Sequence, residues 1–410
     1  MLSKENKEMI PRLCNAEECT ACSACYNVCP KAAITMRTDN YGESHPFVNA
    51  GKCIHCGLCE KVCPALNKVT LTQNEKPLVY CCWLKDANRR KESTSGGAAF
   101  AIARTIIEKG GHVWGAAYDQ DMNVRYTEAN TIEELGAIQK SKYVQSIVGD
   151  SFKAIKSELD AGEYVLFAGT GCHVMGLRAF LRKDYPRLFT MDLVCHGVPG
   201  QGVFQKYRQW IEHRHGDVMT AYIPRPKRES DGQEIGYYAL AKFKNIGDLK
   251  LTGLDNSYFV GFQHNLFLRS ACHDCKANGE RRYSDFTVAD FWGLGKVAPF
   301  KPYKERTLGI SMLALNSEKA RLLFEVFKDD MVYELRSYKE ASFSNTQYYK
   351  SAVPSPLREK FRNDFSNTSW EELAERYMQT SMKENVLWGI KKYTPPHLLL
   401  YAKLLAKWIK

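Results

Sequence analysis

The sequence has no run of about 18 apolar residues, the length that a membrane-spanning helix needs. Its first residues show no signal-peptide pattern, so we expect the chain to stay in a reducing compartment, the cytoplasm. The basic residues are scattered and accompany no recognition motif, so the net charge of +11 does not predict nucleic-acid binding. What remains is an ordinary globular protein of 410 residues, long enough for two or three domains.

Cysteine, in contrast, is abundant, with 15 residues. In a reducing compartment these thiols are expected to bind metal rather than to form disulfides. Eight of them lie in two arrays that share the spacing C-x2-C-x2-C-x3-C-P: Cys19, Cys22, Cys25 and Cys29, then Cys53, Cys56, Cys59 and Cys63. This repeat is typical of bacterial ferredoxins with two 4Fe–4S clusters.

The spacing also predicts which thiols share a cluster. Three cysteines in C-x2-C spacing can surround one corner of a cube, whereas the fourth ligates the other cluster. We therefore assign one cluster to Cys19, Cys22, Cys25 and Cys63, and the other to Cys29, Cys53, Cys56 and Cys59. Structural zinc is the alternative, but it usually takes separated C-x2-C pairs and fits two complete arrays poorly. Cys14 has no place in either array, and we expect it to be a bystander.

Two turns of small residues precede predicted helices. Ser95, Gly96 and Gly97 lead into an amphipathic helix over 99–107, and Thr170 and Gly171 follow a strand over 164–168. A helix N-terminus offers free N–H groups and a positive dipole end to a phosphate. A simple helix cap explains the first turn as well. Lys142 and Tyr143 lie between these turns in the sequence. They either bind the phosphate and a ring of a ligand or simply form a solvated turn.

Four further cysteines predict a third cluster. Cys172 and Cys195 follow two apolar segments that we expect to be neighbouring parallel strands, whose carboxyl ends are where ligands bind. Cys272 and Cys275 form a C-x2-C pair that completes a set of four thiols, with structural zinc as the alternative. Cys81 and Cys82 are adjacent on a predicted strand, so they point to opposite faces and are expected in the core.

The motifs together resemble the beta subunit family of coenzyme F420 hydrogenase/dehydrogenase. They are the two cysteine arrays, TSGGA, KSKYVQS, GTGCH, DLVCHGVP, RSACHDC and RRYSDFTVADFWG, and the resemblance covers about residues 19–316. It implies bound FAD, which exchanges electrons with a deazaflavin or similar hydride donor and with 4Fe–4S clusters. It also implies that Ser95, Gly96, Gly97, Lys142 and Tyr143 contact the flavin and that the third set of thiols holds the nearest cluster.

The sequence departs from that family at GTGCH. The family usually has proline and glutamine where this chain has Gly171 and His173. The hydride donor is therefore not carried over from the family. We expect FAD between the turn at Ser95–Gly97 and the turn at Thr170 and Gly171.

We expect a fold of mixed α+β and α/β class. A ferredoxin domain over 1–75 precedes an α/β flavin-binding domain, in two parts over 76–165 and 166–335. A helical tail follows over 336–410. Its last helix, over 397–410, has an apolar face, which we expect to dock on the rest of the protein or on a partner protein rather than on a membrane surface. The basic segment 225–228 is expected to be a surface loop.

Two functions from different classes follow. The first is a flavin- and iron–sulfur-dependent oxidoreductase that takes electrons from a small hydride donor and exchanges them with a ferredoxin or another redox partner protein. We assign no side chain as acid or base, because the flavin carries the hydride chemistry. The second is a non-catalytic electron-transfer subunit that docks on a partner enzyme, for example in surface-polysaccharide synthesis, with which some similar bacterial proteins are associated.

Overall fold

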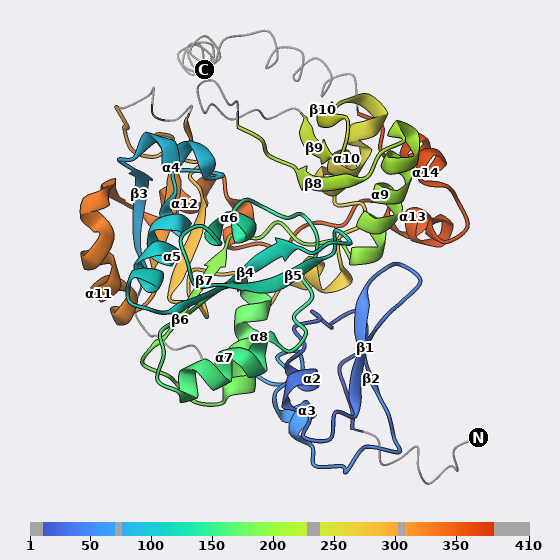
Figure 1. The fold of residues 1–410 in the computed structure, drawn as a ribbon, viewed down its shortest axis with the longest axis horizontal. Helices are drawn as coiled ribbons and strands as arrows, with labels where there is room; N and C mark the ends of the chain where they lie inside the picture. Colours follow the sequence, from blue (N-terminus) through green and yellow to red (C-terminus); the bar gives the residue numbers. More distant parts are fainter. Residues whose placement is uncertain (1–10, 70–75, 228–237, 302–304, 306–307, 381–410) are drawn as a thin grey trace.

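The structure is a computed structural model that describes residues 11–69, 76–227, 238–301, 305 and 308–380. An N-terminal module packs against a larger α/β unit (Figure 1). The module contains the short helices α2 (Ala24–Val28) and α3 (Leu58–Lys61) and an antiparallel hairpin of β1 (Ile34–Thr38) and β2 (Ser44–Val48). The helices and the cysteine loops lie beside one end of the hairpin, and the hairpin's other end reaches towards the larger unit (Figure 1).

The larger unit is built on a mixed sheet in the order β13-β3-β12-β11-β7-β6-β4-β5. Strands β4, β6, β7 and β11 run parallel to one another, and antiparallel strands extend the sheet on both sides. The bounds are β3 (Leu78–Leu84), β4 (His112–Tyr118), β5 (Val124–Ala129), β6 (Val165–Thr170), β7 (Leu188–Leu193), β11 (Phe286–Asp290), β12 (Ser311–Leu315) and β13 (Met331–Arg336). The predicted mixed α/β fold is therefore confirmed, and the predicted parts 76–165 and 166–335 both contribute to one sheet.

Helices cover both faces of this sheet, which explains why its strands β6, β7 and β12 are buried along most of their length. Helices α5 (Ala98–Glu108) and α11 (Glu318–Phe327) pack on one face, against residues such as Leu166 and Leu313. Helices α7 (Ser151–Asp160) and α8 (Gly171–Leu181) pack on the other, against Val165 and Phe167. Shorter helices α4 (Ala87–Glu92), α6 (Leu135–Ile138) and α12 (Tyr338–Phe343) lie around the sheet. Cys81 and Cys82 are buried on opposite faces, as predicted.

A third group of elements has an aromatic core of its own. A small antiparallel sheet of β8 (Met219–Ile223), β9 (Ala239–Phe243) and β10 (Gly247–Leu251) packs with α9 (Gln201–His215) and α10 (Ser257–Gln263). Helices α13 (Arg358–Phe365) and α14 (Trp370–Tyr377) complete this core, in which Trp370 donates to Ser257 Oγ at 3.0 Å. These two helices, which we predicted as part of a tail, are thus packed into the body of the protein. The predicted helix over 397–410 lies outside the described residues.

No helix among the described residues has both the length and the apolarity to cross a membrane.

Glycines bring the module and the larger unit into backbone contact. Gly176 on α8 faces Cys22, and a Cβ atom at position 176 would lie 2.6 Å from Cys22 Cβ. Gly202 at the start of α9 donates to the Gly42 carbonyl at 3.2 Å, and a Cβ there would lie 2.4 Å from Gly42 Cα. A Cβ atom at position 176 or 202 would push the module and the larger unit apart, because the atoms that it meets cannot move aside as the end of a flexible side chain can. The two parts therefore pack this closely only with glycine at these positions.

We therefore expect Gly202→Ala to destabilise the protein by roughly 1–3 kcal/mol, because the new methyl group forces two backbones apart. Gly136→Ala is the matched control, since position 136 is also helical and a Cβ atom there would have no neighbour within 4 Å. Urea unfolding of the iron-loaded protein measures both free energies. Equal midpoints for the two variants would contradict this account of the contact.

Candidate redox site

The N-terminal module brings the predicted thiols together in two sets. Each thiol of the first set lies within electrostatic range of the other three, including Cys63, which belongs to the second array. The first thiol set is Cys19, Cys22, Cys25 and Cys63. This arrangement agrees with the crossed ligation that the spacing predicts, in which the last cysteine of one array joins the first three of the other.

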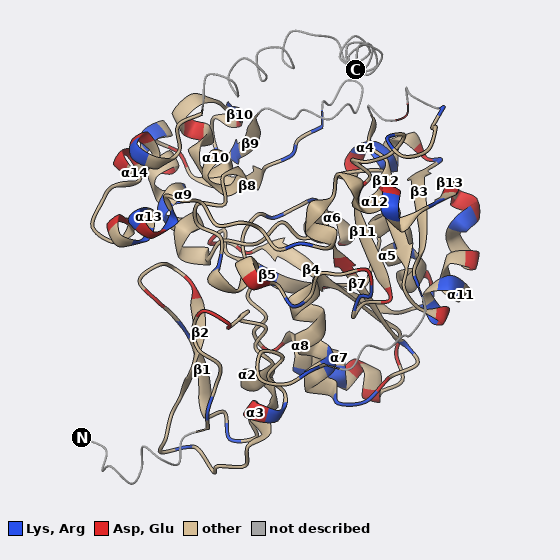
Figure 2. Cartoon of the chain, turned by 180° about the vertical axis from the view of Figure 1, so that it is seen from behind, with Lys and Arg blue, Asp and Glu red and all other residues tan. Residues whose placement is uncertain are grey.

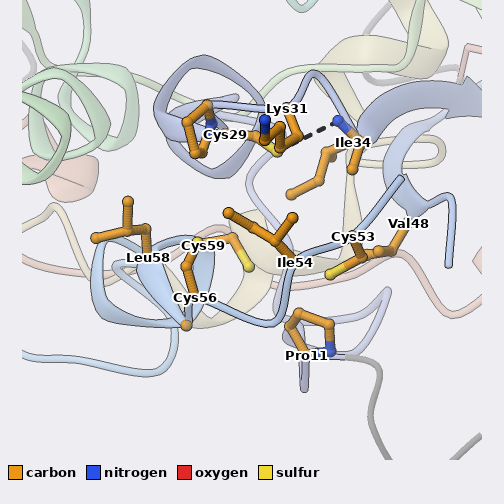
Figure 3. A pocket seen from close by; sticks show the side chains of 13 residues that line it. Pro11, Cys29, Lys31, Ile34, Val48, Cys53, Ile54, Cys56, Leu58 and Cys59 are labelled. Carbon is orange, nitrogen blue, oxygen red and sulfur yellow. Dashed lines mark hydrogen bonds between the residues drawn. The ribbon is translucent and has the colours of Figure 1, made fainter. Parts of the chain in front are cut away.

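The second thiol set lines a small cavity near the surface of the module (Figure 3). The set consists of Cys29, Cys53, Cys56 and Cys59. The Ala33 N–H donates to Cys29 Sγ at 3.3 Å, the kind of contact that stabilises a thiolate ligand. Cys56 is exposed and the neighbouring Ile54 is 54% exposed, so this set lies close to solvent.

The third set combines cysteines from three distant parts of the chain. Cys172 lies in the first turn of α8, directly after β6, and Cys195 follows β7. Cys272 and Cys275 belong to the short 3-10 helix η2 (Ser270–Asp274) and its C-cap. All four thiols lie within electrostatic range of one another. The third thiol set, Cys172, Cys195, Cys272 and Cys275, therefore converges on one place, as a shared metal centre requires.

The spacing of the sulfur atoms distinguishes a cluster from a single ion. Four sulfurs on one tetrahedral zinc, at about 2.3 Å from the metal, lie about 3.8 Å apart. Among the described residues, neither group of metal-ligating atoms gathered within 4.8 Å contains a cysteine. No three of the described thiols thus lie as close together as the ligands of one zinc ion do, a spacing that fits the predicted 4Fe–4S cubes.

Burial keeps three thiols of the third set, those of Cys172, Cys195 and Cys272, protonated until a metal binds. Desolvation raises the pKa of Cys172 to about 11 and that of Cys272 to about 12. The pKa of Cys195 is also raised well above its usual value, mainly by burial. Because iron binds the thiolate, cluster loading has to release protons from these groups.

Helix α8 connects the third set with the first. Cys172 occupies its first turn, and Gly176, one turn later, contacts Cys22. Four residues of helix advance the chain by only about 6 Å. The first set in turn shares its loops with the second, since each array supplies ligands to both. The three thiol sets consequently form a series that runs from the sheet edge to the surface of the module.

A large cavity opens beside the third set. It spans about 4250 Å³, including space open to solvent, and it extends from the turn before α5 to Cys195. The predicted flavin contacts Ser95, Gly97, Lys142, Tyr143 and Thr170 line it. The remaining two, Gly96 and Gly171, do not. A Cβ at Gly96 would meet the Cys82 carbonyl oxygen at 2.4 Å, and one at Gly171 would meet Ala277 Cβ at 2.9 Å.

The turn before α5 has free polar groups for a phosphate. Ser95 Oγ is buried and has no hydrogen-bond partner, although it lines the cavity. The neighbouring Ala99, on the first turn of α5, is exposed in the same cavity. Lys227 Nζ donates to the Ser95 carbonyl at 2.7 Å and so fixes the turn. An unpaired hydroxyl at the N-terminus of an 11-residue helix suits the pyrophosphate of FAD.

Gly97 lines the cavity and also has a structural reason to be glycine. Its φ is +94°, in the left-handed region, and a Cβ would lie 2.4 Å from Leu84 Cδ1. The backbone conformation and the core therefore both require glycine at this position.

Lys142 is more constrained than the sequence indicates. Its ammonium donates to the carbonyls of Ala137 and Gln139, at 3.0 and 2.5 Å. Burial lowers the pKa of Lys142 to about 7. Tyr143 stacks on Phe262 with ring centroids 4.3 Å apart, so it forms part of a flat aromatic wall of the cavity.

Sequence reasoning missed a charged group at the cavity wall. We expected 225–228 to be a surface loop, but Arg225 pairs with Asp290 and lies 4.9 Å from the ring of Trp292. All three residues line the cavity. The signal in the sequence was Asp290 itself, which ends an apolar strand on a buried sheet and therefore needs a cationic partner.

The structure also places Cys14 and His173. Cys14, expected to be a bystander, places its thiol against those of Cys19 and Cys63. His173, the departure from the family pattern, is 1% exposed and contacts the Tyr126 hydroxyl through Nδ1 at 2.9 Å. Burial lowers the pKa of His173 to about 4, so the imidazole is neutral. It does not line the cavity and therefore does not reach a ligand bound there.

We expect Cys275→Ser to lose about four of roughly twelve iron atoms while both ferredoxin-type clusters remain, because only the third set loses a ligand. Cys81→Ser is the control, since Cys81 is equally a buried thiol but lies on β3, away from all three sets. Iron and sulfide analysis after anaerobic purification provides the measurement. Wild-type iron content in Cys275→Ser would show that the third set holds no cluster.

Two family models match parts of this chain. Residues 162–341 match the family model for the C terminus of the coenzyme F420 hydrogenase/dehydrogenase beta subunit, and residues 18–67 match that of the 4Fe–4S dicluster domain. No curated protein matches. Thirteen chains of solved structures match. One belongs to the F420-reducing NiFe hydrogenase complex of Methanosarcina barkeri, at 16% identity and a TM-score of 0.42, covering 74% of this chain and 92% of that one.

The dicluster match covers both cysteine arrays, and the family match begins just before β6 and includes the third set of thiols. The chain therefore combines an N-terminal 4Fe–4S dicluster domain with a segment, residues 162–341, that matches the C-terminal part of the coenzyme F420 hydrogenase/dehydrogenase beta subunit family.

Proposed function

We propose that this protein is a flavin- and iron–sulfur-dependent oxidoreductase that exchanges electrons between a small hydride donor and a redox partner protein. The cavity carries the proposal. It reaches from a free phosphate-binding turn at Ser95 to Cys195 of the third thiol set. A dinucleotide that places its phosphates at one end can thus place its redox ring near a cluster at the other.

When bound, FAD supplies the conversion between a two-electron hydride and single electrons. The protein residues hold and orient it. Ser95 and the N-terminus of α5 offer donors to the pyrophosphate, and the stacked ring of Tyr143 offers a flat apolar surface. Arg225, Asp290 and Trp292 line a part of the wall where a second planar molecule, the hydride donor, has both a ring to stack on and charged groups to bind.

The second thiol set is the proposed contact with the partner. It is the set nearest to solvent, and the charged residues within 29–34 and 48–63 are Lys31, Lys52, Glu60 and Lys61. The three lysines are exposed, whereas the Glu60 carboxylate already accepts from the Arg12 N–H. This surface is basic, so it suits an acidic electron carrier, such as a ferredoxin of net negative charge.

The flavin site is tested by Ala99→Asp. An aspartate in the first turn of α5 favours the helix but repels a pyrophosphate at its N-terminus. We expect flavin content to fall at least tenfold while iron content stays at the wild-type level. Ala99→Asn, of similar size and without charge, should retain flavin. If Ala99→Asp binds as much FAD as wild type, the phosphates bind elsewhere.

The flavin also distinguishes the enzyme from the alternative, a subunit without a substrate of its own. An enzyme should bleach its flavin when an anaerobic hydride donor is added, and reduced deazaflavin and reduced nicotinamides are the donors to try first. A pure relay should take electrons only from its partner protein. Stopped-flow absorbance at the flavin band records the difference, and dithionite confirms that the flavin can be reduced.

The partner surface predicts a dependence on salt. Reduction of an acidic ferredoxin by the wild-type protein should slow as ionic strength rises, because the attraction between the two surfaces is screened. Lys31→Glu combined with Lys52→Glu and Lys61→Glu should slow it at low salt by about tenfold or more. Lys244→Glu, an exposed change in the turn between β9 and β10, is the control. Equal rates in the triple and control variants would place the contact elsewhere.

A further inference from the structure

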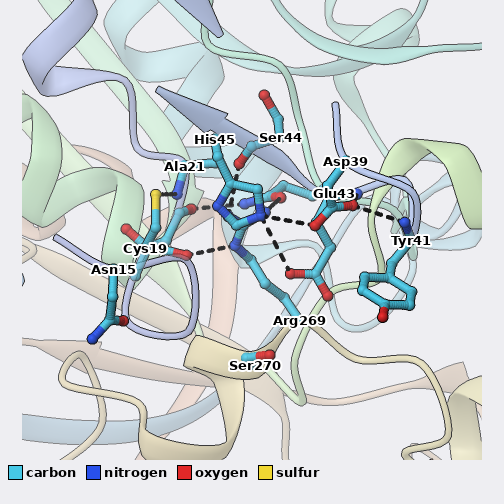
Figure 4. A network of polar contacts seen from close by, with 12 residues as sticks. Asn15, Cys19, Ala21, Asp39, Tyr41, Glu43, Ser44, His45, Arg269 and Ser270 are labelled. Atoms are coloured by element: carbon cyan, nitrogen blue, oxygen red, sulfur yellow. Dashed lines mark hydrogen bonds and ion pairs between the residues drawn. The ribbon is translucent and has the colours of Figure 1, made fainter. Parts of the chain in front are cut away.

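Arg269 lies at the junction between the module and the larger unit, and it is 1% exposed (Figure 4). Three of the contacts of its guanidinium are to the module: Nε donates to the Cys19 carbonyl at 2.6 Å, and Nη2 lies 2.7 Å from the Ser44 carbonyl and 3.2 Å from His45 Nδ1. Nη1 donates to Gln145 Oε1 at 2.9 Å. The fork of the guanidinium therefore fixes both the first cysteine loop and the start of β2.

The same residue belongs to the loop of the third thiol set. Its carbonyl accepts from the Cys272 N–H at 2.9 Å, and its own N–H donates to the Val198 carbonyl at 2.9 Å. Gln145 strengthens the junction, since its Nε2 donates to the Thr20 carbonyl at 2.7 Å. Arg269 thus joins the backbone beside the third set to the backbone beside the first.

The charge of Arg269 has no carboxylate in direct contact. Among the described residues, no acidic group forms an ion pair with it. The nearby Asp39 and Glu43 contact His45 instead (Figure 4). Glu43 also pairs with Arg362. Glu43 lies within electrostatic range of Arg269, but burial raises the pKa of this carboxyl and Arg362 shares its charge. A buried cation without its own counter-charge is costly.

Thiols of two sets surround this cation. Cys19 lies within electrostatic range of Arg269 on one side, and Cys172 and Cys272 do so on the other. An oxidised 4Fe–4S cube with its four thiolates carries about −2. Clusters bound by the first and third sets would therefore supply the missing counter-charge from both sides. Reduction adds a further negative charge, which a neighbouring cation stabilises.

We propose that Arg269 is a positioning residue that holds the first and third thiol sets next to each other and raises the reduction potentials of both clusters. This role rests on the proposed third cluster. An electron that passes between the two centres oxidises one and reduces the other, and no bond forms or breaks. The second set has no contact with Arg269, so its potential should be independent of this residue.

The test is an electron paramagnetic resonance titration of the iron-loaded full-length protein, with Arg269→Gln compared with wild type. Signals are assigned with Cys56→Ser and Cys275→Ser, which each remove one cluster. We expect the first and third clusters of Arg269→Gln to shift to more negative potentials, by about tenfold in the reduction equilibrium, which is about 59 mV for one electron. The second cluster should not shift.

Arg362→Gln is the matched control, because Arg362 pairs with Glu43 at the edge of the same network. It should leave all three potentials unchanged. Arg269→Lys keeps the charge but not the fork, so it should keep the potentials and slow electron transfer from the third to the first cluster. If Arg269→Gln loads too little iron, the lysine variant decides: wild-type potentials support the proposal, and potentials lowered on both clusters contradict it.

Unchanged potentials in a fully loaded Arg269→Gln protein would overturn the electrostatic role. A wild-type protein with only about eight iron atoms would instead refute the third cluster. The two failures are distinguishable, because the first cluster can still be titrated in the second case.

Discussion

The parallel alignment of β6 and β7 is the constraint on which the rest of the site depends. Thr170 pairs with Leu193 at the ends of these strands, and Cys172 and Cys195 each follow two residues later. Parallel strands end at the same sheet edge, so the two thiols leave the sheet at one level and beside one cavity. The C-x2-C pair on η2 then needs only to close over them. A shift in this register would separate the thiols and also move the start of α8.

Helix α8 extends that arrangement from the sheet edge to the ferredoxin-type module. Its first turn carries Cys172, and its second turn contacts Cys22 at a position where only glycine fits. The close approach matters because electron transfer slows as the distance between centres grows. Gly42 and Gly202 secure the hairpin in the same way, and the guanidinium of Arg269 closes the remaining side of the junction. Packing and hydrogen bonds thus serve one purpose, which is to keep the cluster sites adjacent.

The cavity combines features that the neighbouring strands and loops supply separately. The turn before α5 provides the unpaired Ser95 hydroxyl, the aromatic wall at Tyr143 provides a flat surface, and the strand end at Asp290 provides a charged pair with Arg225. The family matches indicate iron–sulfur redox chemistry, and the cavity supports the proposal that this protein also has a substrate of its own. The Ser95 hydroxyl supports the proposal, since it is buried without a hydrogen-bond partner and its residue lines the cavity.

The sequence by itself determined the thiols of the two cysteine arrays, their crossed grouping and the α/β class. Those features follow from local spacing and hydrophobic pattern, which a chain carries in its order of residues. It also indicated the third set, because Cys172 and Cys195 each follow an apolar strand. Only the tertiary structure decided that Gly97 packs against Leu84, that Arg225 faces the cavity, and that Cys14 and Arg269 lie beside the cluster sites. These contacts join residues up to 250 positions apart, as between Cys19 and Arg269, and no local pattern encodes a contact between such distant segments.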